Sequence, residues 1–478
     1  MYLKKLSLYI PKPSASFAPV IKLKGRHPWI PNDNEKNIAE ILNAIGIKDP
    51  LELFSDIPKS ITLKKKLAVG RGRPLSSFEI EKEFDGIIND LKDFELNKIF
   101  AGGPIAPHYT HPVVDAIISR GEILTAYTPY QPEISQGLLQ MLYEYQSAMA
   151  ILYDVDIVNA GMYDGATALA EASLMAVRVK KIKKVMVPST LFYEYKDVMR
   201  TYFMGPEVSL IEYETDNDTG EATPENISLI KSERPAAVII DYPANTGEVR
   251  RTTPEIIQET HAVGSLAIVF SDPIALGVLT PPGKFEADIV VGEGQSLGLP
   301  MYGGGMTLGI LGIRNERELI RNLPGRLIGE TVDVDGRRGY MMILQSREQH
   351  IRREKATSNI TTGVSLNSIA ALVSLAIKGS NGIRKEGIAI FENTKRLMNA
   401  FSNAGALIQR PRAVHFKNIS FSIPSAENSM TLFENIVKDR KLIPYSIREE
   451  GLMSCATEVH KSEDISELEN ALKEAMNG

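Results

Sequence analysis

The sequence predicts an α/β protein with a mainly parallel central sheet. Three continuous apolar runs, at residues 236–240, 266–270 and 289–291, are typical of strands that are buried on both faces of such a sheet. Two shorter runs, at 185–187 and 208–211, precede them, and segments with helical periodicity separate the strands. With 478 residues, 43% of them hydrophobic, the chain is long enough for two or three domains in one compact subunit.

The N-terminal part is expected to lie outside this domain. Residues 1–25 contain five lysines, three prolines and no acidic residue, so we expect a disordered basic extension, or a stretch upstream of the true start. Residues 26–120 are expected to form a helical arm. Apolar residues recur there at helical spacing between positions 38 and 45 and again between 78 and 91. Such an arm would pack on the main domain or on a neighbouring subunit.

The remaining chain is expected to form a large α/β domain at residues 121–360 and a small α+β domain at 361–478. Strands of the small domain are predicted at 419–423 and 451–456. The single cysteine, Cys455, lies in the second of these strands, so we expect a buried, inert thiol.

The ends of two predicted strands indicate which chemistry to look for. Active groups of parallel α/β sheets lie at the carboxyl ends of the strands. Asp272 follows the strand at 266–270, and Ser296 lies just beyond the strand at 289–291. In enzymes that use pyridoxal phosphate, two such ends supply a carboxylate for the pyridinium nitrogen and a lysine for the Schiff base. Here the carboxylate is present, but Ser296 stands at the lysine position and a hydroxyl cannot form an imine.

A second position also disfavours this cofactor. The helix predicted after Asp164 begins with a glycine, and free N–H groups at such a helix start can bind a phosphate. Asp164 is a natural N-cap that can accept from those N–H groups itself, and its charge would repel a phosphate. We therefore interpret Asp272 and Asp164 as vestigial and expect no cofactor on this chain.

Six motifs are more specific than any of these single features. In chain order they are YTPYQPEISQG (127–137), MYDGATALAEA (162–172), SDPIALGVL (271–279), GEGQSLG (292–298), GETVDVDGRRGY (329–340) and REQHIRREKATSNI (347–360). Together they resemble the first subunit of the split P-protein of the glycine cleavage system, which is a glycine dehydrogenase (decarboxylating). The resemblance covers about residues 26–478.

This resemblance implies a fold, partners and an activity. The fold would be that of pyridoxal-phosphate enzymes of the aspartate-aminotransferase type. One subunit of the split enzyme carries the lysine and the cofactor, and the other, which this chain resembles, does not. Pyridoxal phosphate would therefore lie on subunit 2, the lysine-bearing partner, in an assembly of two copies of each subunit. That assembly would decarboxylate glycine and pass the aminomethyl group to the lipoyl arm of the H-protein.

The candidate site residues lie in the first motif and are polar or aromatic: Tyr127, Tyr130, Glu133, Ser135 and Gln136. Loops of this kind often carry function, although a proline-rich packing loop would show the same pattern. The resemblance favours an active-site wall shared between subunits. The charged tract at 329–360 would be a solvated salt-bridge surface or, by the resemblance, a subunit contact or the rim of the same site.

Three other functions are weighed against this interpretation. An NAD-binding oxidoreductase is suggested by the glycines after the strand at 289–291, but the third glycine falls one residue late and no helix start follows. A self-sufficient pyridoxal-phosphate enzyme would need another lysine, for which Lys355 is the only tempting position. A purely structural scaffold for the catalytic subunit stays open.

Composition excludes further classes. A net charge of -5 and a pI near 5.9 argue against general binding to nucleic acids or anionic membranes. We find no apolar run long enough to span a bilayer, and one cysteine allows no disulfide framework, so we expect a cytoplasmic protein. We expect no metal site, because the seven histidines form no cluster in the sequence.

Overall fold

The computed structural model describes residues 29–30, 33–62, 74–303, 306–361, 363–424, 429–449 and 451–477. The chain divides into two compact units, Met1–Lys92 and Asp93–Gly478. Residues 1–25, expected to be a basic extension, lie outside the described residues. Within the described ranges, no helix is long and apolar enough to cross a bilayer.

The first unit contains two amphipathic helices, α2 (Glu35–Ile45) and α3 (Ser77–Leu91), and the 3-10 helix η1 (Pro50–Phe54). The two helices predicted for the arm are thereby confirmed. Ser76 and Glu79 form a capping box at the start of α3, and Gly46 ends α2 in the left-handed conformation. None of the residues in these three elements is buried.

A seven-stranded sheet forms the centre of the second unit, with the strand order β1-β7-β6-β5-β4-β2-β3. The strands are β1 (Ile157–Val158), β2 (Lys184–Pro188), β3 (Ser209–Tyr213), β4 (Ala237–Asp241), β5 (Leu266–Phe270), β6 (Ile289–Glu293) and β7 (Gly309–Ile313). Strands β2 to β6 pair in parallel, whereas β7 is antiparallel to both β6 and β1. The mainly parallel sheet is therefore confirmed, and each of the five predicted runs forms one of its strands.

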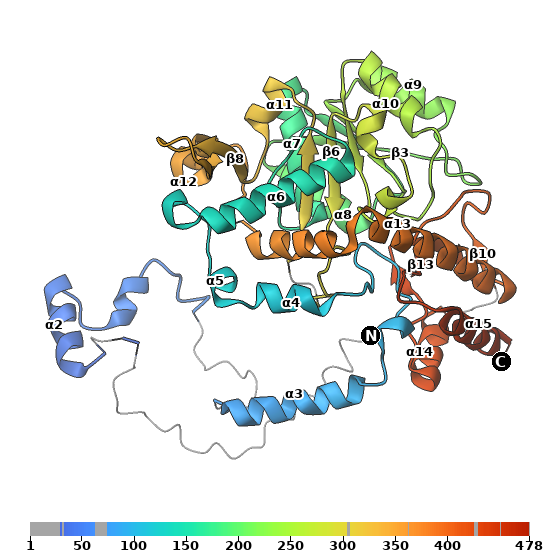
Figure 1. Ribbon diagram of the computed structural model, residues 1–478. Helices are drawn as coiled ribbons and strands as arrows, with labels where there is room; N and C mark the ends of the chain where they lie inside the picture. Colours follow the sequence, from blue (N-terminus) through green and yellow to red (C-terminus); the bar gives the residue numbers. More distant parts are fainter. Residues whose placement is uncertain are drawn as a thin grey trace. The chain divides into compact units, whose positions relative to one another are not determined.

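Helices cover both faces of this sheet (Figure 1). One face carries α7 (Gly165–Lys180), α8 (Tyr193–Met204) and α11 (Arg317–Asn322). The other carries α6 (Gln136–Tyr153), α9 (Pro224–Glu233), α10 (Thr253–Ala262) and the first half of α13 (Ser365–Asn403). Helix α4 (Pro112–Ile118) packs against α13. Every residue of β4 and β5 is buried because alternate side chains enter the two apolar cores, which explains the continuous apolar runs in the sequence.

A second, antiparallel sheet lies towards the C-terminus, in the order β10-β11-β13-β12. Its strands are β10 (Leu407–Ile408), β11 (Asn418–Ser422), β12 (Ser446–Arg448) and β13 (Gly451–Cys455), and its helices are α14 (Ser429–Arg440) and α15 (Ser462–Asn477). Helix α13 kinks at Gly379 and runs from the large sheet to α15 beside the small one (Figure 1). Both predicted strands of this region are confirmed, and burial raises the pKa of Cys455 to about 12, as expected for an inert thiol.

Residues 93–120, which the sequence analysis assigned to the arm, belong to the second unit. The reason is a set of long-range contacts: the Phe100 N–H donates to the Ile443 carbonyl at 2.7 Å, and the Cys455 N–H donates to the Phe100 carbonyl at 2.8 Å.

The smaller elements of this unit are α5 (Gly121–Leu124), α12 (Gln349–Arg352), the hairpin of β8 (Leu327–Val332) and β9 (Arg338–Ile343), and the 3-10 helices η2 (Leu96–Lys98), η3 (Pro132–Ile134), η4 (Ala275–Gly277), η5 (Pro282–Phe285), η6 (Gln345–Arg347) and η7 (Arg353–Lys355).

Candidate functional site

The carboxyl ends of β4, β5 and β6 meet at a small cavity of about 40 Å³, here called the strand-end pocket. Its lining includes Gly103, Tyr195, Asn245, Asp272, Glu293 and Lys417. Pockets that hold small molecules usually have volumes of about 300–1,000 Å³. This cavity therefore has room only for water-sized occupants.

Asp272 faces Lys417 in this pocket. The two form an ion pair in which both side chains are largely buried, and the Ile274 N–H donates to the other carboxylate oxygen at 2.9 Å. Burial by itself would raise the pKa of Asp272, but the Lys417 ammonium outweighs it and holds the pKa below its usual value. Lys417 therefore takes the place in which the resemblance would put a pyridinium nitrogen.

Glu293 occupies the start of helix α7. Its carboxylate accepts hydrogen bonds from the Gly165 N–H at 2.9 Å and from the Gln295 N–H at 3.0 Å. Burial raises its pKa from the usual 4.5 to about 7, although these hydrogen bonds act in the opposite direction. Asp164 caps the same helix by accepting from the Thr167 N–H at 2.7 Å, as predicted. Two carboxyl groups thus stand where a phosphate would bind.

Ser296 is buried, and its Oγ has no hydrogen-bond partner among the residues that the structure describes. Its neighbour Gln295 accepts from the Ala106 N–H at 3.3 Å and donates to the Leu299 carbonyl at 2.9 Å, which fastens residues 103–109 over this end of the sheet. Residues 294–302 form turns and irregular chain rather than a helix, so the basis for an NAD site is missing here.

These residues do not fit pyridoxal phosphate. The carboxylate that would bind the ring nitrogen is engaged by Lys417, the helix start that would bind the phosphate is engaged by Glu293, and no lysine stands at position 296. The space left between them is about 40 Å³.

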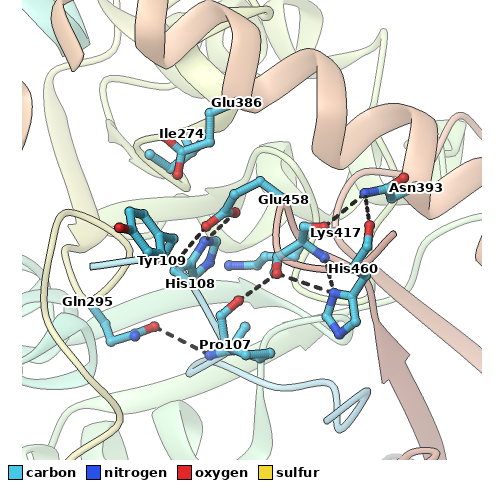
Figure 2. Close-up of polar contacts among 12 residues, drawn as sticks. Pro107, His108, Tyr109, Ile274, Gln295, Glu386, Asn393, Lys417, Glu458 and His460 are labelled. Carbon is cyan, nitrogen blue, oxygen red and sulfur yellow. Dashed lines mark hydrogen bonds and ion pairs between the residues drawn. The ribbon is translucent and has the colours of Figure 1, made fainter. Parts of the chain in front are cut away.

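A buried ion network lies beside the pocket, and Figure 2 shows its members His108 and Glu458 facing each other. The distance from His108 Nδ1 to Glu458 Oε2 is 2.9 Å. The ligand atoms of His108, Glu458 and Glu386 lie within 4.8 Å of one another, a spacing that could hold a metal ion and that no sequence pattern reveals. Glu386, however, forms an ion pair with Lys378 at 2.8 Å, and Glu458 also accepts from the Tyr109 N–H at 2.7 Å. We therefore interpret the group as an ion network in which Glu458 holds His108 and Tyr109, with Glu386 of α13 close beside them.

Tyr130, one of the predicted site residues, has a different setting. This residue is 41% exposed, while its hydroxyl accepts a hydrogen bond from Arg326 Nη2 at 3.0 Å. The ring of His350 packs edge-on against it, with the ring centres 5.6 Å apart. Arg326 is buried and forms an ion pair with Glu348. We call Tyr130, Arg326, Glu348 and His350 the Tyr130 cluster.

The other predicted site residues lie around this cluster in two groups. Tyr127 and Glu133 are exposed, and Ser135 is half-buried before the first turn of α6. Gln136 instead holds the backbone of Tyr340: its Nε2 donates to the Tyr340 carbonyl at 2.9 Å, and its Oε1 accepts from the Tyr340 N–H at 2.8 Å. Gln136 thereby ties the loop at 127–137 to the hairpin of β8 and β9.

The fold brings four of the six sequence motifs together at this place. The motif at 347–360 contributes Glu348 and His350, and its Asn359 N–H donates to Glu171 of the motif at 162–172 at 3.1 Å. The motif at 329–340 is joined through Gln136. The tract at 329–360 is thus partly surface and partly a buried support for Tyr130.

Sequence reasoning missed Arg326, Lys417 and Glu293 as members of either site. Glu293 carried a signal, because it directly follows a predicted strand within the motif at 292–298. Arg326 and Lys417 lie outside the six motifs, and no local pattern distinguishes them from surface cations.

Comparisons with known proteins agree with this picture. The family described as "Glycine cleavage system P-protein" matches residues 27–472. A protein of Saccharolobus islandicus described as "Probable glycine dehydrogenase (decarboxylating) subunit 1" is 40% identical over 456 residues, which cover 95% of this chain and 99% of that protein.

Solved structures show the same relationship. The crystal structure of a glycine decarboxylase (P-protein) of the glycine cleavage system, in inhibitor-bound form, is similar with a TM-score of 0.78 at 36% identity, covering 94% of this chain and 100% of that one. An alanine–glyoxylate aminotransferase of Nostoc sp. shares the fold alone, with a TM-score of 0.55 at 13% identity over 79% of this chain and 95% of that one. The expected aminotransferase-like fold is therefore confirmed, and the chain belongs to the glycine cleavage system P-protein family.

Proposed function

We propose that this chain is the non-lysine subunit of a glycine decarboxylase and that it acts only together with a lysine-bearing subunit 2. The assembled enzyme, with two copies of each subunit, decarboxylates glycine in the cytoplasm and transfers the aminomethyl group to the lipoyl arm of the H-protein. Relatives that are named as subunit 1 of this enzyme support the proposal.

The observation that carries the proposal is the contrast between the two sites. Protein groups fill the strand-end pocket, where Lys417 binds Asp272 and Glu293 binds the start of α7. The Tyr130 cluster, by contrast, presents a partly exposed tyrosine on a buried, ion-paired support. A chain that cannot hold its own cofactor but presents a rigid polar surface is suited to completing a site on another subunit.

Within this proposal the roles differ by residue. Pyridoxal phosphate, as electron sink, is held by the lysine-bearing subunit. Tyr127, Tyr130 and Glu133 of this chain form the shared wall, which orients glycine and excludes water from it. Ser135 and Gln136 support that wall from the start of α6, since Gln136 is committed to the backbone of Tyr340.

Glycine–bicarbonate carbon exchange tests the proposal. The assay contains H-protein and pyridoxal phosphate with this chain alone, with subunit 2 alone, or with both. We expect exchange only when both are present. A yellow imine and exchange with this chain alone would overturn the proposal in favour of a self-sufficient enzyme, and borohydride trapping would then identify the lysine.

A pure scaffold is distinguished by substitution in the wall. Tyr130→Ala and Glu133→Ala should each lower exchange by the assembled enzyme markedly, whereas a scaffold predicts unchanged turnover. Gln140→Ala serves as a matched control, because Gln140 is exposed on α6 and bonds only Glu144 of its own helix among the contacts described. Equal behaviour of all three variants would favour the scaffold.

A further inference from the structure

Arg326 fixes both the position and the hydrogen-bonding direction of Tyr130. An arginine side chain can only donate hydrogen bonds, so in its 3.0 Å contact with Arg326 Nη2 the Tyr130 hydroxyl oxygen is the acceptor. The hydroxyl proton must then point elsewhere. Among the described residues, this hydroxyl makes no second hydrogen bond.

Arg326 itself cannot move freely. It forms an ion pair with Glu348, and its Nη2 also donates to the Thr361 carbonyl. Its own carbonyl accepts from the Ala160 N–H at 2.8 Å, which attaches this turn to the strand region of the large sheet. The side chain is only 5% exposed, and buried, multiply bonded arginines hold their geometry well.

The ring of Tyr130 is restrained as well. His350 packs against it at an interplanar angle of 73°, and the guanidinium of Arg326 lies 5.3 Å from the ring centre. These contacts cover the inner side of the tyrosine. Tyr130 nevertheless stays 41% exposed, so its hydroxyl proton is left for an acceptor outside this chain.

We infer that Arg326 is a positioning residue that holds Tyr130 as an outward hydrogen-bond donor to the carboxylate of the substrate. This inference rests on the proposed function. Glycine offers one acceptor group, its carboxylate, and an outward O–H donor that is held from behind by a cation fits an anionic oxygen. His350 and Glu348 act through the same tyrosine, by restraining its ring and its arginine.

The test uses the assembled enzyme and a double-mutant cycle. Tyr130→Phe removes the hydroxyl donor and leaves the contacts of Arg326 with Glu348 and Thr361 intact. Arg326→Lys keeps the positive charge but loses the planar guanidinium, which contacts Glu348, Thr361 and the Tyr130 hydroxyl at once. Each single variant should raise the KM for glycine by about tenfold to a hundredfold, the usual size for a hydrogen bond to a charged group. The double variant should be no worse than Tyr130→Phe, because Arg326 acts through the hydroxyl.

Arg347→Lys is the matched control. Arg347 holds the same turn by donating to the carbonyls of Leu323 and Gly325, but it makes no described contact with Tyr130. Its KM for glycine should stay within about twofold of the wild-type value, since it carries no hydrogen bond to the substrate. An equal rise in this control would show that distortion of the turn explains the effect and would overturn the inference.

Pyridoxal phosphate affinity is measured in parallel by absorbance titration. An unchanged affinity in Tyr130→Phe is expected, whereas a loss of affinity without a rise in KM would assign the tyrosine to the cofactor and refute the inference. Additive effects in the double variant would refute it too. If the mixture of wild-type chain and subunit 2 is active, either of these refuting results leaves the proposed function intact. If that mixture is inactive, both the proposed function and the inference are overturned.

Discussion

Replacing Glu293 by glutamine tests how the strand-end pocket is filled. Burial raises the pKa of this carboxyl from the usual 4.5 to about 7. The folded protein therefore keeps the proton up to about pH 7, whereas the unfolded chain releases it near pH 4.5. The contribution of Glu293 to the free energy of unfolding is thus largest below pH 4.5. It is lost as the pH rises from there through the folded pKa.

The magnitude follows from the two values. Their difference of about 2.5 corresponds to roughly 3 kcal/mol, because one pKa unit is worth about 1.4 kcal/mol. Glutamine removes this pH-dependent loss. It can still accept from one of the two N–H groups of Gly165 and Gln295, but its amide nitrogen cannot accept from the other. That mismatch lowers the free energy of unfolding of Glu293→Gln by about 1–3 kcal/mol at every pH. The test is therefore how the difference between the variant and the wild type changes with pH.

The assay is urea unfolding of the full chain at a series of pH values between about 5 and 8, followed by far-UV circular dichroism. Tryptophan fluorescence would not report on this unit, because the only tryptophan, Trp29, lies in the first one. The free energy of unfolding of the wild type should fall by up to about 3 kcal/mol relative to Glu293→Gln across this range.

Asp216→Asn provides the control. Hydrogen bonds from the Thr219 hydroxyl and from the Thr219 and Asp218 N–H groups lower the pKa of Asp216. Its stabilising contribution is complete above the unfolded pKa and is lost only as the pH falls through the lowered pKa. The difference between Asp216→Asn and the wild type should therefore stay nearly constant over the measured range. Parallel curves for Glu293→Gln and the wild type would refute the reasoning about Glu293.

Three further outcomes are expected. Lys417→Met should lower the free energy of unfolding by about 3–5 kcal/mol at pH 7, since it leaves the buried Asp272 without its ammonium. Burial raises the pKa of Asp272 once Lys417 is gone, so that loss should shrink as the pH falls below this raised pKa. Asp272→Asn combined with Lys417→Met should recover much of the stability; strictly additive losses would contradict the pairing. Ser296→Lys should not produce an imine with pyridoxal phosphate, because Lys417 and Glu293 fill the positions of the ring nitrogen and the phosphate; a lysine labelled by borohydride would show otherwise. Gly247→Ala should destabilise strongly, by at least about 3 kcal/mol, because its φ is +111° and a Cβ would lie 1.9 Å from the Asn418 carbonyl oxygen. Gly336→Ala, with φ +78° and open space, should cost only about 1–2 kcal/mol, and similar losses for the two variants would contradict this steric account.

Several features of this protein are local enough for the sequence to predict them. The runs that form β4, β5 and β6 are apolar throughout because both faces of a parallel sheet are covered, and this pattern needs no tertiary information. The cap at Asp164 was predictable for the same reason, since a cap and its helix are neighbours in the chain. The six motifs identified the family, and the absence of a lysine at position 296 was visible directly.

Other features depend on contacts between distant residues. Lys417 meets Asp272 across 145 positions, and Arg326 meets Tyr130 across 196, so no window of sequence contains either pair. The boundary of the second unit moved to Asp93 for the same reason, because the 93–109 segment is held by strands near the C-terminus.

The sequence by itself determined the fold, the family and the serine at position 296, because periodicity, caps and motifs are local properties. Only the tertiary structure decided which groups engage Asp272 and the start of α7, and which loop stands on a buried support. Those outcomes depend on ion pairs and hydrogen bonds whose strength comes from burial, and burial exists only once the chain has folded.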